Sequence, residues 1–141
     1  MRCIEGRLRP PFFLLLALAL ALAGCARRAA ESFPGEVTGT VSYRERIALP
    51  PEAELSVTLY ETTGAAAEPR FVAAQLMRLS AGPPARFRVA YPPGVIDARA
   101  GYTLVARIEV GGKLWFVNEQ PVPVLTLGNP ARADLVVTRV P

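Results

Sequence analysis

The stretch YTLVARIEVGGKLWFV, residues 102–117, carries the pattern that decides the fold. Apolar residues alternate with polar ones as far as Val110, glycine stands at 111 and 112, and apolar residues resume after Lys113. A period of two is that of a β-strand with one buried face, and a glycine pair between two such runs is typical of a two-residue hairpin turn. The stretch therefore predicts an antiparallel β-hairpin.

Two registers of this hairpin are open. A two-residue turn pairs Ile108 with Trp115, so that Phe116 points away from the main core. A three-residue loop with a bulge pairs Ile108 with Phe116 instead and turns Trp115 outward. The glycine pair matches the two-residue turn best, so we expect the first register.

In that register large apolar side chains lie on the face of the hairpin opposite the main core. A loop at residues 121–125 covering this face would explain them as ordinary packing. The functional interpretation is an apolar strip on which a partner segment docks. We take as the candidate partner strip Val105, Arg107, Leu114 and Phe116.

The same alternation recurs along the rest of the chain, at residues 37–44, 55–60 and 86–91. Proline and glycine clusters separate these runs, for example at 82–84 and 92–94. Many short strands with such spacing indicate an all-β sandwich or barrel. We expect an antiparallel, immunoglobulin-like β-sandwich of about seven or eight strands over residues 36–141. Residues 71–79 fit a strand or a short amphipathic helix, and the β surroundings favour the strand.

The N-terminal segment has the features of a lipoprotein signal peptide. Arg2, Arg7 and Arg9 precede the run FFLLLALALALAG at 12–24, which is shorter than the roughly 20 apolar residues of a membrane-spanning helix. The run ends in Leu-Ala-Gly-Cys, which resembles the bacterial lipobox. We expect signal cleavage between Gly24 and Cys25, with the Cys25 thiol carrying a diacylglycerol of palmitate-type chains.

Residues 25–35, CARRAAESFPG, show no strand or helix period and predict a lipidated flexible tether after a signal peptide at 1–24. Two or three acyl chains amount to a permanent anchor. Alanine rather than aspartate follows the cysteine, which by the enteric-type sorting rule favours the outer membrane, facing the periplasm.

The composition argues against catalysis and against metal binding. The chain has no histidine, and its one cysteine beyond the signal peptide is the expected lipid carrier. Zinc, copper and thiol catalysis therefore lose their usual ligands and nucleophiles, and we expect neither an enzyme nor a bound metal or cofactor. The net charge of +4 is spread along the chain, without the dense basic stripe of a nucleic-acid interface.

Two segments, VTGTVSYRERIALPPEAELSVTL at 37–59 and YPPGVIDARAGYTLVARIEVGGKLWFVNEQPVPVLTLG at 91–128, resemble a known family. They are similar to the YbaY-type envelope lipoproteins, grouped with the YscW-type lipoprotein chaperones, or pilotins, of type III secretion. The resemblance implies a lipid-anchored, pilotin-like β-sandwich. For the pilotin branch it also implies binding of the C-terminal segment of a secretin and its delivery to the outer membrane.

Two hypotheses on function follow. The first is a non-enzymatic outer-membrane lipoprotein that binds an envelope protein, as a secretin pilotin or assembly chaperone. The alternative is a carbohydrate or cell-wall binding module, in which Tyr60, Trp115 or Tyr43 would present an aromatic platform to sugar rings.

Overall fold

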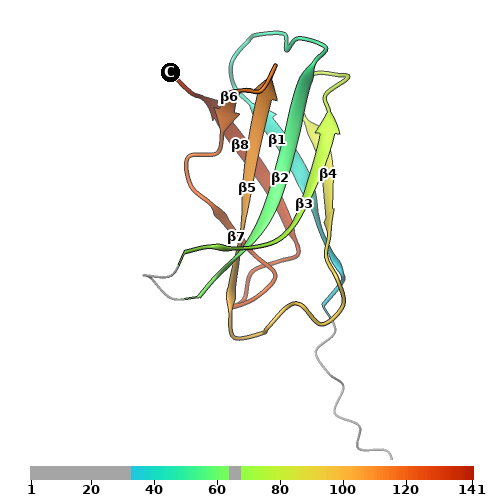
Figure 1. Cartoon of the computed structure of the whole chain (residues 1–141), viewed down its shortest axis with the longest axis vertical. Helices are drawn as coiled ribbons and strands as arrows, with labels where there is room; N and C mark the ends of the chain where they lie inside the picture. Colours follow the sequence, from blue (N-terminus) through green and yellow to red (C-terminus); the bar gives the residue numbers. More distant parts are fainter. Residues whose placement is uncertain (1–32, 64–67) are drawn as a thin grey trace, which may run out of the picture. The chain divides into compact units, whose positions relative to one another are not determined.

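Eight β-strands follow one another in the computed structural model, which describes residues 33–63 and 68–141 (Figure 1). They are β1 (Glu36–Tyr43), β2 (Ala53–Thr62), β3 (Arg70–Arg78), β4 (Ala85–Ala90), β5 (Gly101–Val110), β6 (Lys113–Val117), β7 (Val122–Val124) and β8 (Arg132–Arg139). The all-β class and the strand number expected from the alternating pattern are confirmed. The ambiguous segment 71–79 lies mostly in β3, so the preference for a strand there is also confirmed.

The strands form one sheet in the order β3-β2-β5-β6-β8-β1-β4, with β7 pairing to β5 beside this path. Neighbouring strands are antiparallel except for β1 and β8, which run parallel. The sheet curls until its two end strands lie close together (Figure 1), where the backbone N–H of Arg88 on β4 donates to Oε1 of Gln75 on β3 at 2.5 Å. The result is a nearly closed, barrel-like sheet.

The expected antiparallel sandwich of two sheets needs correction in this respect. Strand β6 pairs with β5 along one side and with β8 along the other, so the two halves of the structure are joined by main-chain pairing. The β6–β8 junction is short, with Phe116 opposite Arg139 and Val117 opposite Thr138. A short junction of this kind cannot be read from the period of a sequence, because alternation reports which side chains are buried and not which strands are neighbours.

The core fills the inside of the curled sheet with alternate side chains. Strand β2 buries every second residue from Ala53 to Leu59, and β5 does so from Tyr102 to Val110. The largest fully buried side chains are Tyr102, Phe116, Leu55, Leu59, Leu104, Ile108 and Leu135. Burial of large aliphatic and aromatic groups is the main stabilising contribution in a sheet of this kind.

Gly39 lies on β1 between Ala133 of β8 and Phe87 of β4, its partners in the two neighbouring strands. A Cβ atom at this position would overlap the carbonyl oxygen of Ala133 on β8, and it would come within 2.9 Å of the ring of Phe87 on β4. Only glycine leaves room for both the parallel strand and the aromatic ring. This residue therefore fixes how β1 packs between β8 and β4.

Asn118 completes the pairing of β5 between β6 and β7. Its side chain is buried, accepts a hydrogen bond from the backbone N–H of Ala106 at 2.8 Å and donates to the carbonyls of Leu104 and Gln120 at 3.3 and 2.7 Å. A side-chain amide thus replaces the main-chain partner that a continuous strand would supply.

The described chain begins with residues that already contact the sheet. Phe33 packs against the core, and the backbone of Gly35 exchanges hydrogen bonds with Tyr91: its N–H donates to the Tyr91 hydroxyl at 3.1 Å and its carbonyl accepts from the Tyr91 N–H at 3.0 Å. The last three residues of the expected tether, 33–35, therefore belong with the sheet.

Candidate docking surfaces

The predicted partner strip is divided by the observed register. Val105 and Arg107 lie on the outer face of β5, with Arg107 exposed and Val105 half-buried, and Leu114 is half-buried opposite Glu109. Phe116 lies opposite Ile108 and is fully buried in the core. The expectation that Phe116 points outward is therefore wrong, and the strip as predicted does not form.

A bulge after the turn is the physical cause. Val110 pairs with Lys113 across Gly111 and Gly112, whose φ angles of 57° and 77° match the expected two-residue turn. One extra residue, Trp115, then lies between the pairs that involve Leu114 and Phe116, so the register shifts by one. The two adjacent aromatic residues at 115 and 116 are the only hint of this shift in the sequence.

Trp115 is half-buried at the edge of the core, and the guanidinium of Arg139 lies 5.5 Å from its ring centroid. The ring face is thus already covered by a cation from its own chain. Tyr43 stacks on Phe116 at 4.9 Å between ring centroids and donates its hydroxyl to the carbonyl of Ile47. These contacts weaken the aromatic platform of the carbohydrate hypothesis.

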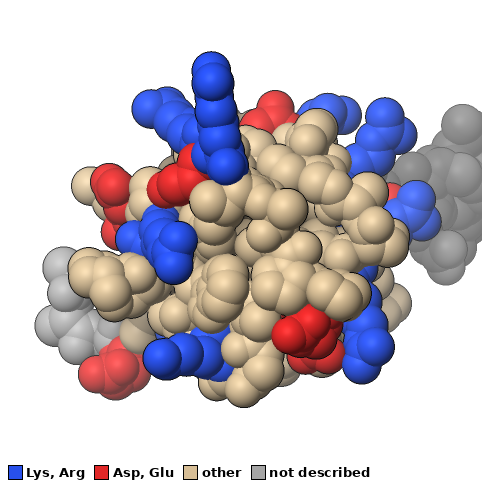
Figure 2. Space-filling view, turned by 90° about the horizontal axis from the view of Figure 1, so that it is seen from above, with Lys and Arg blue, Asp and Glu red and all other residues tan. Residues whose placement is uncertain are grey.

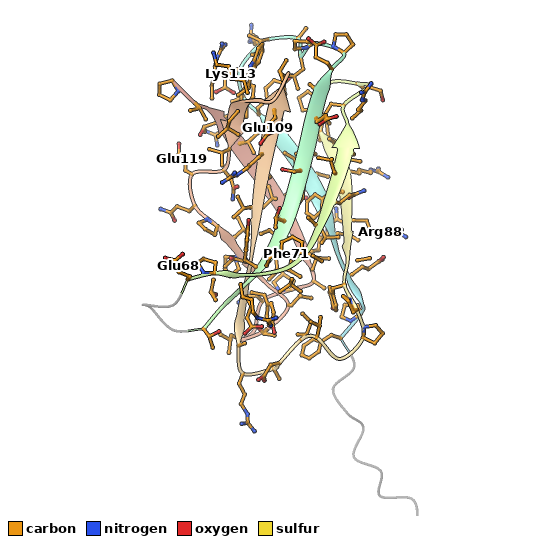
Figure 3. The ribbon with its side chains drawn as sticks, viewed as in Figure 1. Glu68, Phe71, Arg88, Glu109, Lys113 and Glu119 are labelled. Carbon is orange, nitrogen blue, oxygen red and sulfur yellow. The ribbon has the colours of Figure 1, made fainter. Side chains whose placement is uncertain are left out.

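Strand β3 carries exposed apolar side chains on its outer face. Phe71, labelled in Figure 3, is 59% exposed and Leu76 is 69% exposed. The ring of Tyr60 on β2 meets the ring of Phe71 edge to face, with 6.5 Å between centroids. The sequence around residues 71–79 favours a strand but does not indicate that its outer face is apolar.

An uncharged pocket lies at the end of the sheet where β1 and β3 finish. Its volume is about 540 Å³, and it is lined by Tyr43, Ile47, Ala48, Leu49, Pro51, Leu79, Ser80, Ala81, Gly82 and Pro83. We call it the end pocket. Figure 2 looks onto this end of the molecule, where uncharged surface occupies the middle and many charged side chains lie towards the rim.

The end pocket adjoins the hydrophobic core. A small space of about 10 Å³ shares several of its lining residues, among them Leu49 and Leu79, and is also lined by the buried side chains of Leu55 and Ile108. Pockets that take apolar ligand groups have walls of this composition. The end pocket is therefore an apolar receptacle that adjoins the core.

Displaced pKa values mark structural contacts in this protein. A hydrogen bond from Arg70 lowers the pKa of Glu61, while burial raises the pKa of the hydroxyls of Tyr91 and Tyr102. The Tyr102 hydroxyl accepts from the backbone N–H of Asp97 at 2.9 Å. Within residues 33–63 and 68–141, no cluster of three or more acidic or cysteine side chains is placed to hold a metal ion.

Gly24 and Cys25, the predicted cleavage and lipidation positions, lie outside the described residues. In the described part of the chain, no helix has the length and apolar character needed to cross a membrane.

Three comparisons with known proteins point to lipoproteins and pilotins of bacterial secretion systems and envelopes. The family described as "Type III secretion system lipoprotein chaperone (YscW)" matches residues 34–137. The lipoprotein YbaY of Escherichia coli (strain K12) is 32% identical over 145 aligned positions, covering 89% of this chain and 76% of that protein. An alternative pilotin from the type II secretion system of Vibrio cholerae has a similar structure, with a TM-score of 0.71 and 34% identity over 75% of this chain and 96% of that one.

Proposed function

Because the chain belongs to the YscW family of secretion-system lipoprotein chaperones, we propose that it is a lipid-anchored, pilotin-like protein that binds a segment of another envelope protein. The family and its structural neighbour are of chaperone and pilotin type, and such proteins are not enzymes. The protein therefore acts by binding. The resemblance to an E. coli lipoprotein supports a place in the cell envelope.

The end pocket is the observation that carries this proposal. It is large enough for several apolar side chains, its lining holds no charged residue, and it adjoins the core. An apolar segment of a partner that fills it would remove its own side chains and the pocket walls from water together. A secretin segment, or that of another outer-membrane assembly component, is the partner we propose.

The end pocket lies at the end of β1 that is farther from the N-terminal segment. Tyr43, the last residue of β1, lines the pocket, whereas Phe33 and Gly35 precede the first residue of that strand. Figure 1 shows the two ends of β1 at opposite ends of the sheet. Eight extended residues separate the two ends by about 26 Å. With Cys25 lipidated in the outer membrane, as we propose, the chain joins the sheet at the end away from the pocket.

The first test compares the acylated protein with a Cys25→Ser variant, each recovered from membranes of its own host after mild crosslinking. We expect a secretin or another outer-membrane assembly component to be recovered with the acylated form, and less of it with the variant. The recovered proteins are identified by mass spectrometry. Reproducible recovery of no envelope protein would contradict the proposal.

A second test addresses the end pocket itself. Ala81 lines the pocket and is exposed, so Ala81→Glu places a charge among apolar walls without disturbing the core. We expect crosslinking to the partner to fall about tenfold, since a buried unpaired charge costs more than 1.4 kcal/mol. Ala98→Glu, at an exposed alanine outside this pocket, is the matched control and should crosslink as the unmodified protein does. Equal crosslinking by both variants would exclude the end pocket as the docking site.

A further inference from the structure

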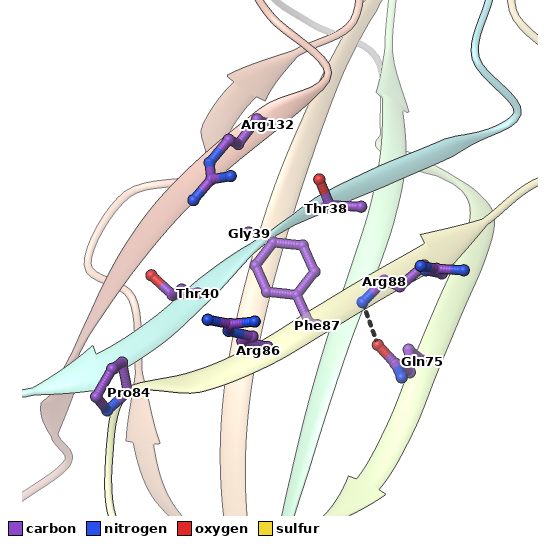
Figure 4. Close-up of a pocket in the computed structure, with 9 residues that line it drawn as sticks. All are labelled: Thr38, Gly39, Thr40, Gln75, Pro84, Arg86, Phe87, Arg88 and Arg132. Carbon is purple, nitrogen blue, oxygen red and sulfur yellow. Dashed lines mark hydrogen bonds between the residues drawn. The ribbon is translucent and has the colours of Figure 1, made fainter.

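A second hollow lies on the outer face of β8, β1 and β4, and its lining shares no residue with that of the end pocket (Figure 4). Its volume is about 480 Å³. The residues that line it are Thr38, Gly39, Thr40, Gln75, Pro84, Arg86, Phe87, Arg88 and Arg132. We call it the arginine groove, because three arginines, Arg86, Arg88 and Arg132, line it.

Two of the three guanidinium groups are available to a ligand. Arg88 forms an ion pair with Glu36 at 3.4 Å. Arg86 and Arg132 are exposed, and within the described residues no carboxylate oxygen lies within 4.0 Å of either. A guanidinium presents a planar set of N–H donors that suits carboxylate and phosphate oxygens.

Acidic side chains also border the groove and limit where an anion can lie. Asp134 on β8 accepts a hydrogen bond from the Thr40 hydroxyl at 2.8 Å, and Glu36 is held by Arg88. With three arginines against two carboxylates, the groove retains an excess of positive charge. The strand register places Arg132 and Arg88 on either side of Thr38, in the row next to that of Asp134.

The spacing of the arginines favours an extended ligand over a single small anion. Arg132 and Arg88 lie two strands apart across Thr38, a separation of about 10 Å between their backbones. Arg86 and Arg88 are separated by one residue on β4, about 7 Å along the strand. Arg86 and Arg132 lie in adjacent rows on opposite sides of β1, about 12 Å apart between their backbones. In an extended peptide with carboxylates on alternate residues, two carboxylates four residues apart are separated by about 13 Å.

We propose that the arginine groove binds an extended acidic peptide segment with carboxylates on alternate residues, of which two, four residues apart, pair with Arg86 and Arg132. Thr38 and Thr40 line the groove. In the proposed complex the Thr38 hydroxyl donates to a main-chain carbonyl of the peptide, and the Thr40 hydroxyl, which donates to Asp134, accepts from a peptide N–H. This inference goes beyond the proposed function, since it assigns a separate site with a ligand of different chemistry. It holds whether or not the end pocket takes a partner.

The test uses the protein purified from its own membranes in a nonionic detergent and a fluorescent peptide of alternating glutamate and threonine. Binding is followed by fluorescence anisotropy at low and at physiological salt. We expect saturable binding that weakens with salt, and about tenfold or greater loss in the double variant Arg86→Gln/Arg132→Gln. The double variant Arg99→Gln/Arg107→Gln removes the same charge from exposed positions elsewhere and should bind nearly as the unmodified protein does.

Three outcomes would overturn the inference. The first is an absence of saturable binding, as expected if the arginines only protect the end strand β4 from pairing with other chains. The second is equal loss in both double variants, which would indicate attraction by overall charge. The third is binding of phosphatidylglycerol vesicles, dependent on Arg86 and Arg132, in place of the peptide, which would assign the groove to a membrane surface. The variant Ala81→Glu should still bind the peptide, so failure of the end pocket is distinguishable from failure of the groove.

Discussion

At the scale of single residues, Gly39 shows how one position determines the approach of three strands. The alternating pattern places Gly39 on the buried face of its strand, and the structure agrees. The pattern does not reveal that a carbonyl of β8 and the ring of Phe87 occupy the space of the missing side chain. Such a requirement depends on contacts between residues far apart in the sequence, which alternation does not report.

Replacing Gly39 with alanine should destabilise the protein strongly. The new methyl group overlaps the Ala133 carbonyl, which belongs to the backbone and cannot move without disturbing β8. We expect the free energy of unfolding to fall by about 3 kcal/mol or more, measured by denaturant unfolding. Gly82→Ala is the control, since a Cβ there meets no atom within 4 Å, and it should change stability by less than about 0.5 kcal/mol. A Gly39→Ala protein as stable as the control would contradict this account.

At the scale of elements, the sequence predicts the strands better than it predicts their register. The hairpin 101–117 and its glycine turn follow from period and turn chemistry, whereas the strand at 70–78 is favoured only by its β surroundings. The bulge at Trp115 does not, because the extra residue is apolar like its neighbours and leaves the alternation ambiguous. One residue of shift moved Phe116 from the predicted docking strip into the core.

Because of the bulge, we expect different effects of substitution at two apolar residues of β6, Leu114 and Phe116. Phe116 is fully buried, so Phe116→Ala should lower the free energy of unfolding by about 3–5 kcal/mol. Leu114 is only half-buried on the outer face, so Leu114→Ala should cost less than about 1.5 kcal/mol. Urea unfolding of both variants measures the difference. If Leu114→Ala lowered the free energy of unfolding more than Phe116→Ala did, the result would contradict the bulge and support the register without it.

At the scale of the whole molecule, the order of strands is the feature that sequence reasoning missed. Seven of the strands lie on one path that curls until β3 and β4 meet, and β1 pairs in parallel with β8. The clearest strands share one alternating signature, so the sequence does not distinguish a closed path from two stacked sheets. The candidate sites depend on this arrangement, because both hollows are lined by residues from distant parts of the chain.

Two buried tyrosines predict how the whole molecule responds to alkaline pH. Burial raises the pKa of Tyr91 and Tyr102 above that of an unfolded tyrosine, about 10. The unfolded chain therefore loses these protons first, so their stabilising contribution is present below about pH 10 and is lost as the pH rises above it. We expect denaturant unfolding to report falling stability above pH 10, and a smaller fall in the double variant Tyr91→Phe/Tyr102→Phe. Parallel pH curves for the two proteins would contradict this explanation.

The parallel pairing of β1 with β8 also determines when the fold can be completed. A chain that emerges from synthesis with its N-terminus first presents β1 early, but the strand that joins β1 to β6 arrives last. Until then the chain can form the local hairpins, while β1 and β4 remain separate from the rest of the sheet. Contacts between residues so distant in the sequence slow folding, because a long loop must close before they are gained. Completion of the sheet therefore has to wait for the final strand.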